Sequence, residues 1–153
     1  MERILHTTEL AAGKAPPRID IGRILHPRSV AVLGASDSLD KFGGRIMHFL
    51  VRHGFAGEIY PINLHRKEIA GRRAFERITA VPASPDIAIL AVPIEHLVRS
   101  VEEAAAAGVG CSVIIATGFA EAGDDGEQRQ ASLVRIASES GMRIIGPNCM
   151  GMI

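Results

Sequence analysis

The glycine-rich segment 34–44 holds the residue types that most directly suggest chemistry, which is the binding of phosphate. Gly34 permits a tight backbone turn, and small side chains after it leave backbone N–H groups open to an anion. Gly43-Gly44 opens a helical stretch whose amino terminus favours negative charge. The combination predicts a phosphate-binding loop, in preference to a turn whose glycines serve only close packing. The residues of this loop that we expect to bind phosphate are Gly34, Ala35, Ser36 and Lys41.

This loop differs from the two common nucleotide-binding motifs. The dinucleotide pattern Gly-x-Gly-x-x-Gly requires glycine where Ser36 and Leu39 stand. The next strand ends at Asn63, without the acidic residue that binds a ribose 2′-hydroxyl. The Gly-Lys-Ser/Thr of a P-loop is missing as well. An NAD(P)-binding oxidoreductase domain is therefore disfavoured, although it stays an alternative of the same fold class.

Apolar runs alternate with amphipathic stretches along the rest of the chain. Buried strands are expected at 30–33, 58–62, 86–92, 111–116 and 143–145. Helices are expected around Ile46, Phe49 and Leu50, over 95–107, and over 127–140 with Leu133, Val134, Ile136 and Ala137 inward. This order predicts an α/β fold with a doubly wound, mostly parallel five-stranded sheet. Ligands of such sheets bind beyond the carboxyl ends of the strands.

Composition narrows the classes of protein further. The chain has 153 residues, which suggests one domain, with 17 basic and 17 acidic side chains and 47% apolar residues. Zero net charge disfavours nucleic-acid binding, and no apolar run is long enough to span a membrane. Cys111 and Cys149 fit neither a disulfide framework nor a metal motif, and we expect a cytoplasmic protein with reduced thiols. Residues 1–22 are expected to form an N-terminal arm, and residues 23–153 the domain.

Five stretches in register resemble the CoA-binding domain of NDP-forming acyl-CoA synthetases, relatives of the alpha subunit of succinyl-CoA synthetase. Each stretch is weak by itself, but their order and spacing match over roughly 24–153. The resemblance implies a Rossmann-like fold that binds CoA or acyl-CoA. The stretches are His-Pro-Arg-Ser-Val-Ala-Val-Leu-Gly-Ala-Ser (26–36), Gly-Glu-Ile-Tyr-Pro-Ile-Asn (57–63), Asp-Ile-Ala-Ile-Leu-Ala-Val-Pro (86–93), Gly-Phe-Ala-Glu (118–121) and Gly-Pro-Asn-Cys-Met-Gly (146–151).

The resemblance also implies which residues contact CoA. The first loop and Lys41 would face its phosphates. The remaining contacts would be Asn63 by the adenosine part, Val92 and Pro93 against the adenine or pantetheine, Thr117, Gly118 and Phe119 along the pantetheine channel, and Asn148 near the reacting thiol.

One departure from the family concerns the loop after the second strand. The family commonly has Asn-Pro-Lys there, whereas this chain has Asn63-Leu64-His65. The change frees the loop and removes a cation that would face phosphate. Arg66 and Lys67 are the nearest replacements in the sequence.

The resemblance implies a ligase whose catalytic machinery lies largely elsewhere. In the family, phosphate passes between an acyl phosphate, a histidine of a second domain and a nucleotide in an ATP-grasp domain. None of the six histidines here occupies the phosphohistidine position, and the chain ends where the second domain begins. We therefore expect a part of an acid-thiol ligase that has no catalytic residue of its own and no metal. A stand-alone CoA-binding sensor is the other alternative.

Overall fold

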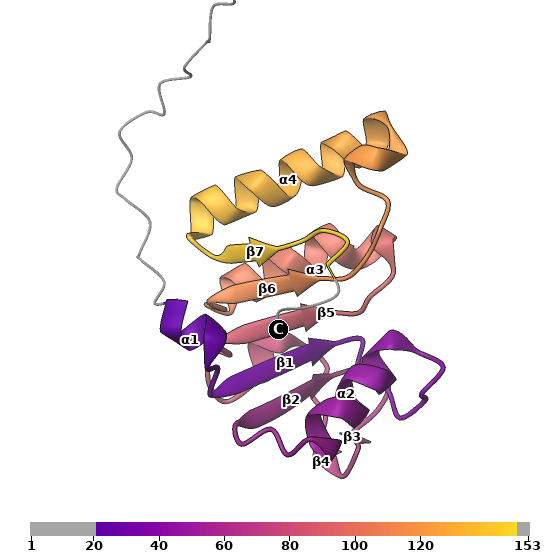
Figure 1. Ribbon diagram of the computed structural model, residues 1–153, viewed down its shortest axis with the longest axis vertical. Coiled ribbons are helices and arrows are strands. Elements are labelled where there is room, and N and C mark those ends of the chain that lie inside the picture. Colours follow the sequence, from indigo (N-terminus) through magenta and orange to yellow (C-terminus); the bar gives the residue numbers. More distant parts are fainter. Residues whose placement is uncertain (1–20, 150–153) are drawn as a thin grey trace, which may run out of the picture.

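A parallel five-stranded sheet forms the centre of the computed structural model, which describes residues 21–149 (Figure 1). The strand order is β2-β1-β5-β6-β7, so the chain winds first one way from β1 and then the other. This confirms the predicted doubly wound α/β fold, with the reversal of direction between β1 and β5. The strands are β1 (Ser29–Leu33), β2 (Glu58–Ile62), β5 (Ile87–Leu90), β6 (Cys111–Ile114) and β7 (Arg143–Ile145).

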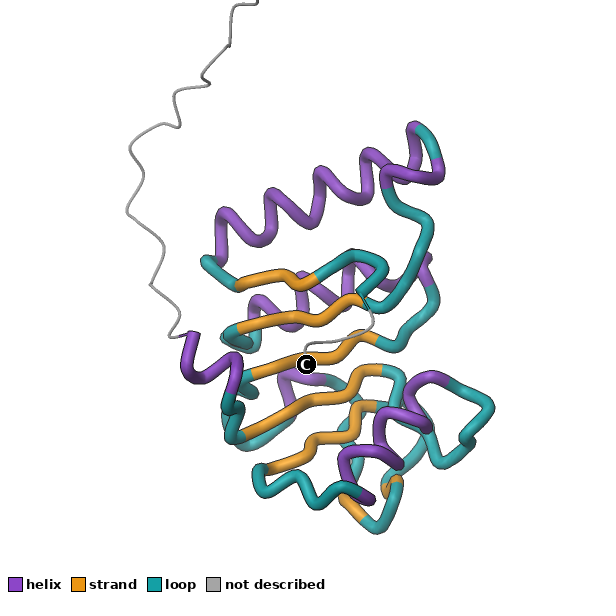
Figure 2. The backbone as a smooth tube through the Cα atoms, in the orientation of Figure 1, coloured by secondary structure: helices purple, strands orange, loops and turns teal. Residues whose placement is uncertain are grey.

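Helices cover both faces of this sheet (Figure 2). One face packs against α2 (Phe42–Arg52), with α1 (Ile21–Leu25) beside it. The opposite face packs against α3 (Ile94–Ala106), α4 (Asp124–Ser140) and the short 3₁₀ helix η1 (Ile78–Ala80). A second 3₁₀ helix, η2 (Ala120–Ala122), precedes α4. Most of the expected N-terminal arm lies outside the described residues, and Ile21 and Gly22 belong to α1.

Most strand residues are apolar because both faces of the sheet are covered; the exceptions include Glu58 and Arg143, exposed at the starts of β2 and β7. In β1, Val30 and Val32 pack with Met47 of α2, whereas Ala31 and Leu33 join the core under α3 and α4. Successive strand residues point to opposite faces, so a sheet with two covered faces needs apolar residues at most positions. The continuous apolar runs of the sequence follow from this arrangement.

A two-stranded antiparallel hairpin lies in the connection between β2 and η1, and the sequence did not predict it. It consists of β3 (Glu68–Ile69) and β4 (Arg72–Arg73). The N–H of Phe75 donates to the carbonyl of Pro61 at 2.9 Å, and the N–H of Asn63 donates back to Phe75 at 2.9 Å. These bonds attach the hairpin to β2, the edge strand of the main sheet, where a proline is tolerated.

Val134, which was predicted to point inward, is exposed. It is 62% exposed, because Leu133 and Ile136 form the inward edge of α4 and Val134 lies one helical step beyond them. On α2, Phe49 is 54% exposed and stacks on His53, while Met47 takes the inward position. The periodicity gave the correct helices but misplaced the side chain of Val134.

A buried carboxylate holds α1 against the amino-terminal edge of the sheet. Asp86 is 5% exposed; it forms an ion pair with Arg23 of α1 and accepts the backbone N–H of Arg28 at 2.8 Å. Burial alone would raise the pKa of Asp86, but the N–H of Arg28 and the Arg23 guanidinium together hold this pKa below its usual value. The contact anchors the first described segment at the edge opposite the carboxyl ends of the strands.

Candidate functional site

The loop between β1 and α2 is held by a glycine that no other residue replaces without strain. Gly34 has φ +80°, and a Cβ on it would lie 2.3 Å from the carbonyl oxygen of Ala91. The N–H groups of Gly34 and Ala35 both donate to the carbonyl of Ile62, at 3.1 and 3.2 Å. The expectation that Ala35 leaves its N–H open is therefore wrong, because β2 uses that donor. Ala35 itself is fully buried.

The paired glycines bring the start of α2 against this loop. A Cβ on Gly43 would lie 1.9 Å from the carbonyl oxygen of Gly34, and one on Gly44 the same distance from that of Ser38. Their immediate role is thus close packing. Lys41 is the exposed N-cap residue of α2, so its charge stands where the unpaired N–H groups of the first helical turn gather. This end of the loop keeps the character of an anion site.

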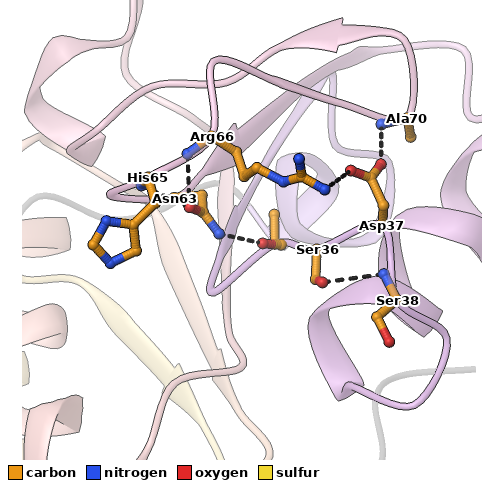
Figure 3. A network of polar contacts seen from close by, with 8 residues as sticks. Ser36, Asp37, Ser38, Asn63, His65, Arg66 and Ala70 are labelled. Atoms are coloured by element: carbon orange, nitrogen blue, oxygen red, sulfur yellow. Dashed lines mark hydrogen bonds and ion pairs between the residues drawn. The ribbon is translucent and has the colours of Figure 1, made fainter.

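Asn63 joins the two loops at the carboxyl ends of β1 and β2 (Figure 3). Its side-chain amide donates to the carbonyl of Ala35 at 2.9 Å. Its side-chain oxygen accepts the N–H groups of His65 at 2.8 Å and Arg66 at 3.1 Å. The amide is committed to these bonds, so Asn63 shapes the edge of the site rather than offering a free hydrogen bond to a ligand.

Asp37 makes the second link between the same loops (Figure 3). One carboxylate oxygen accepts the N–H of Ala70 at 2.9 Å, and the other pairs with the Arg66 guanidinium at 3.3 Å. Ser36 closes the turn by accepting the N–H of Ser38 on its hydroxyl at 3.1 Å. The charge of Arg66 is therefore partly neutralised by Asp37.

A cavity of about 440 Å³ opens at the carboxyl ends of β1, β2 and β5, next to α3. Of the residues predicted from the sequence, Gly34, Asn63, Val92 and Pro93 line it together. The cavity lies at the point where the direction of strand order reverses, where doubly wound sheets bind their ligands. Its apolar walls suit a flat ring, and its polar wall includes the previously unrecognised residues Arg77, His96, Arg99, Ser100 and Glu103.

The other predicted residues lie at the ends of β6 and β7. Thr117 and Asn148 are exposed, and the N–H of Asn148 donates to the carbonyl of Ala116 at 3.0 Å, which joins the two loops. The side chain of Phe119 is fully buried in the core. Phe119 therefore supports the loop from beneath and presents no side-chain surface to a channel.

An exposed carboxylate, that of Glu121, stabilises the loop after β6. Glu121 accepts the N–H of Gly118 at 2.7 Å, and Arg129 donates to the Gly118 carbonyl at 2.8 Å. The N–H groups of Gly118, of Glu121 itself and of Phe119 lower the pKa of the Glu121 carboxyl. These bonds give Glu121 a local structural role in the loop.

Within residues 21–149, no group of three or more His, Cys, Asp or Glu side chains comes together as a metal site. No helix in the same region is long and apolar enough to cross a membrane.

The doubly wound sheet, the glycine turn after β1 and the cavity beside it define a nucleotide-binding domain of the Rossmann type. Residues 28–153 match the family model described as "CoA binding domain". The chain belongs to this family, as the resemblance in its motifs implied.

Similar proteins are acyl-CoA ligases. The chain is 42% identical over 131 residues to a trans-feruloyl-CoA synthase of an unknown prokaryotic organism, covering 86% of this chain and 18% of that one. It is 38% identical over 128 residues to the alpha subunit of ADP-forming acetate–CoA ligase II of Pyrococcus furiosus, covering 84% and 28%. An acetyl-coenzyme A synthetase of Ca. Korarchaeum cryptofilum, solved with phosphate and ADP, superposes with a TM-score of 0.82 at 36% identity, covering 88% and 28%. The chain thus spans less than a third of these relatives.

Proposed function

We propose that this chain binds CoA at the carboxyl edge of its sheet and serves as the CoA-binding part of an NDP-forming acyl-CoA ligase. The observation that carries the proposal is the cavity at the strand-order reversal, whose lining includes the turn at Gly34 together with Val92 and Pro93. Membership in the CoA-binding domain family supports CoA as the ligand that we propose for this cavity.

The chemistry of CoA suits the two ends of this edge. The adenine ring is flat and apolar on its faces, which the cavity walls at Leu33, Ile62 and Val92 would accommodate. The diphosphate is anionic, and the amino terminus of α2 with Lys41 supplies partial and full positive charge. From there the pantetheine would extend toward the exposed loops at Thr117 and Asn148, which stand over β6 and β7.

The remaining steps of ligation require partners. We propose that a phosphohistidine domain and an ATP-grasp domain, in the same polypeptide or in another subunit, deliver the acyl phosphate to the CoA thiol. The alpha-subunit relative supports the second arrangement, since its name marks it as one subunit of a larger enzyme. Mixing this chain with acetyl phosphate and CoA should therefore give no thioester. Thioester formation, followed by absorbance, at a rate above that without protein would refute the proposal that this chain needs catalytic partners.

Calorimetric titration with CoA tests the proposal directly, with NAD⁺ and ATP as comparison ligands. Lys41→Ala should weaken CoA binding about tenfold, because it removes one charge-assisted phosphate contact. The matched control is Arg52→Ala, which removes a cation at the opposite end of the same helix and should change the affinity less than about twofold. NAD⁺ binding without CoA binding would refute the proposal in favour of an oxidoreductase domain.

A stand-alone CoA sensor differs from a ligase component in one measurable respect. A sensor needs no other domain to bind CoA, whereas a ligase component forms a complex with its catalytic partners. Co-purification with an ATP-grasp protein encoded near this chain would support the ligase assignment, and full CoA affinity without any such complex would favour the sensor.

A further inference from the structure

The outward side of α2 has two exposed phenylalanines at its centre. Phe42 and Phe49 are seven residues apart, which places them two turns apart on the same side of the helix. They are 56% and 54% exposed, whereas Met47 on the inward side is buried. A single exposed apolar residue is ordinary, but two aromatic rings on one helical face form a surface that favours contact with a partner.

The side chains around this apolar centre are basic. Residues 41–57 contain one Lys, two Arg and two His, and they contain no Asp or Glu. Arg45, His48, Arg52 and His53 are all exposed. The chain as a whole has 17 basic and 17 acidic side chains, so α2 and its ends concentrate positive charge in a neutral protein.

The charge of Arg45 is positioned but not neutralised. The Arg45 guanidinium donates to the carbonyls of Leu39 at 2.8 Å and Asp40 at 3.2 Å, and it lies 5.2 Å from the centre of the Phe42 ring. These three partners are uncharged groups. Neither Arg45 nor Arg52 forms an ion pair with any Asp or Glu within residues 21–149, so both cations are available to an anionic partner.

The ring of Phe49 is held in place before any partner arrives. The His53 ring stacks on it with centroids 5.8 Å apart, and the His48 ring meets it edge-on at 5.9 Å. The helix itself is fixed, because Gly43 and Gly44 pack directly against the backbone of the preceding loop. Aromatic and arginine side chains that are already ordered lose little entropy on binding, and such residues supply much of the energy of protein interfaces.

We propose that the outward face of α2 docks an acidic amphipathic helix of another protein or domain. Apolar side chains of that helix would cover Phe42 and Phe49, and its carboxylates would pair with Arg45 and Arg52. A second copy of this chain is a poor occupant, because a symmetric contact would bring the same cations together. A lipid surface is a poor occupant as well, because only two apolar side chains form the centre of the face. No residue of α2 lines the cavity proposed for CoA, so docking does not depend on CoA binding.

The test uses a labelled synthetic helix of about 18 residues with leucine along one side and glutamate on both flanks. A comparison peptide has lysine in place of every glutamate. Fluorescence anisotropy should show that the acidic peptide binds at least about tenfold more tightly than the lysine peptide. Phe42→Ala and Phe49→Ala should each weaken the acidic peptide at least about fivefold, and Arg52→Ala about threefold. The backbone amide NMR signals of α2 should shift on binding.

Matched variants separate the docking face from general effects. Val134→Ala shortens an exposed apolar side chain of α4 and should leave the affinity for the acidic peptide unchanged. Because both phenylalanines are exposed, Phe42→Ala and Phe49→Ala should unfold at the same midpoint as the natural chain. The CoA affinity of Phe49→Ala should stay within about twofold, so a failure of docking is distinguishable from a failure of the proposed function.

Four results would overturn the docking face. Two of them are equal binding of the acidic and lysine peptides, and unchanged binding by the Phe42→Ala/Phe49→Ala double variant. The third is tighter binding to phosphatidylglycerol vesicles than to the acidic peptide, which would assign the face to a membrane. The fourth is self-association of the natural chain that Phe49→Ala abolishes, which would assign the face to a second copy.

Discussion

Replacing Gly34 by alanine should damage the fold and the site together. Gly34 combines a φ of +80° with a Cβ position 2.3 Å from the carbonyl oxygen of Ala91, the residue whose N–H bonds to Leu33 between β1 and β5. The positive φ costs an L-residue about 1 kcal/mol, and forcing the two backbones apart adds about 2 kcal/mol. We expect Gly34→Ala to lower the free energy of unfolding by about 3 kcal/mol.

Gly54→Ala is the matched control. Gly54 has a φ of +65° but nothing within 4 Å of its Cβ position, so this variant has the backbone strain without the clash. Its free energy of unfolding should fall by about 1 kcal/mol. Urea unfolding of both variants and of the natural chain measures the difference, and calorimetry measures their CoA affinity. Equal stability of the two variants, with CoA binding kept in Gly34→Ala, would refute the claim that close approach fixes this turn.

Three further outcomes follow from contacts described above. Asn63→Ala removes three hydrogen bonds, one to the Ala35 carbonyl across the two site loops and two within the loop after β2, so it should lower the free energy of unfolding by about 2 kcal/mol and raise backbone amide exchange in both loops. Unchanged exchange would contradict the bridging role of Asn63. Asp86 has a pKa depressed below its ordinary 3.8, so its stabilisation is complete above that pH and is lost as pH falls through the folded-state value. Asp86→Asn should lower the free energy of unfolding by about 2 kcal/mol near neutral pH and by much less in acid, as measured by urea unfolding at a series of pH values. A loss of stability that does not depend on pH would argue against the ion pair with Arg23. Burial raises the pKa of the Cys111 thiol to about 11. A thiol reagent at pH 8 should therefore modify Cys149 in the folded protein and Cys111 only after denaturation. Rapid modification of both thiols in the folded protein would contradict the burial of Cys111.

The sheet was predictable because strands with two buried faces are apolar at most positions. The five strands occur where the apolar runs stand, and each lies within about two residues of the expected bounds at its ends. The hairpin at 68–73 escaped prediction because strands of two residues have no periodicity to detect. Val134 was misplaced because the apolar stripe of its helix is wider than the face that the sheet covers.

The sequence predicted where the residues of the candidate site lie better than it predicted which contacts they make. Gly34, Asn63, Val92 and Pro93 do meet at one cavity, since the carboxyl ends of neighbouring parallel strands share an edge. The sequence could not show that the side-chain amide of Asn63 donates to the carbonyl of Ala35, 28 residues away. Nor could it show that the N–H of Ala35 donates to the carbonyl of Ile62 in β2. Nor could it choose between Arg66 and Lys67, because the partner that occupies Arg66 is Asp37, 29 residues earlier.

The anchoring of α1 through Asp86 has a practical consequence for handling this domain. Helix α1 lies at the amino ends of the strands (Figure 1), whereas the cavity lined by Gly34, Asn63, Val92 and Pro93 lies at their carboxyl ends. A sensor chip or fluorophore coupled at α1 would therefore be separated from this cavity by the length of the strands. Surface-immobilised binding assays can use that end of the domain without shielding the pocket.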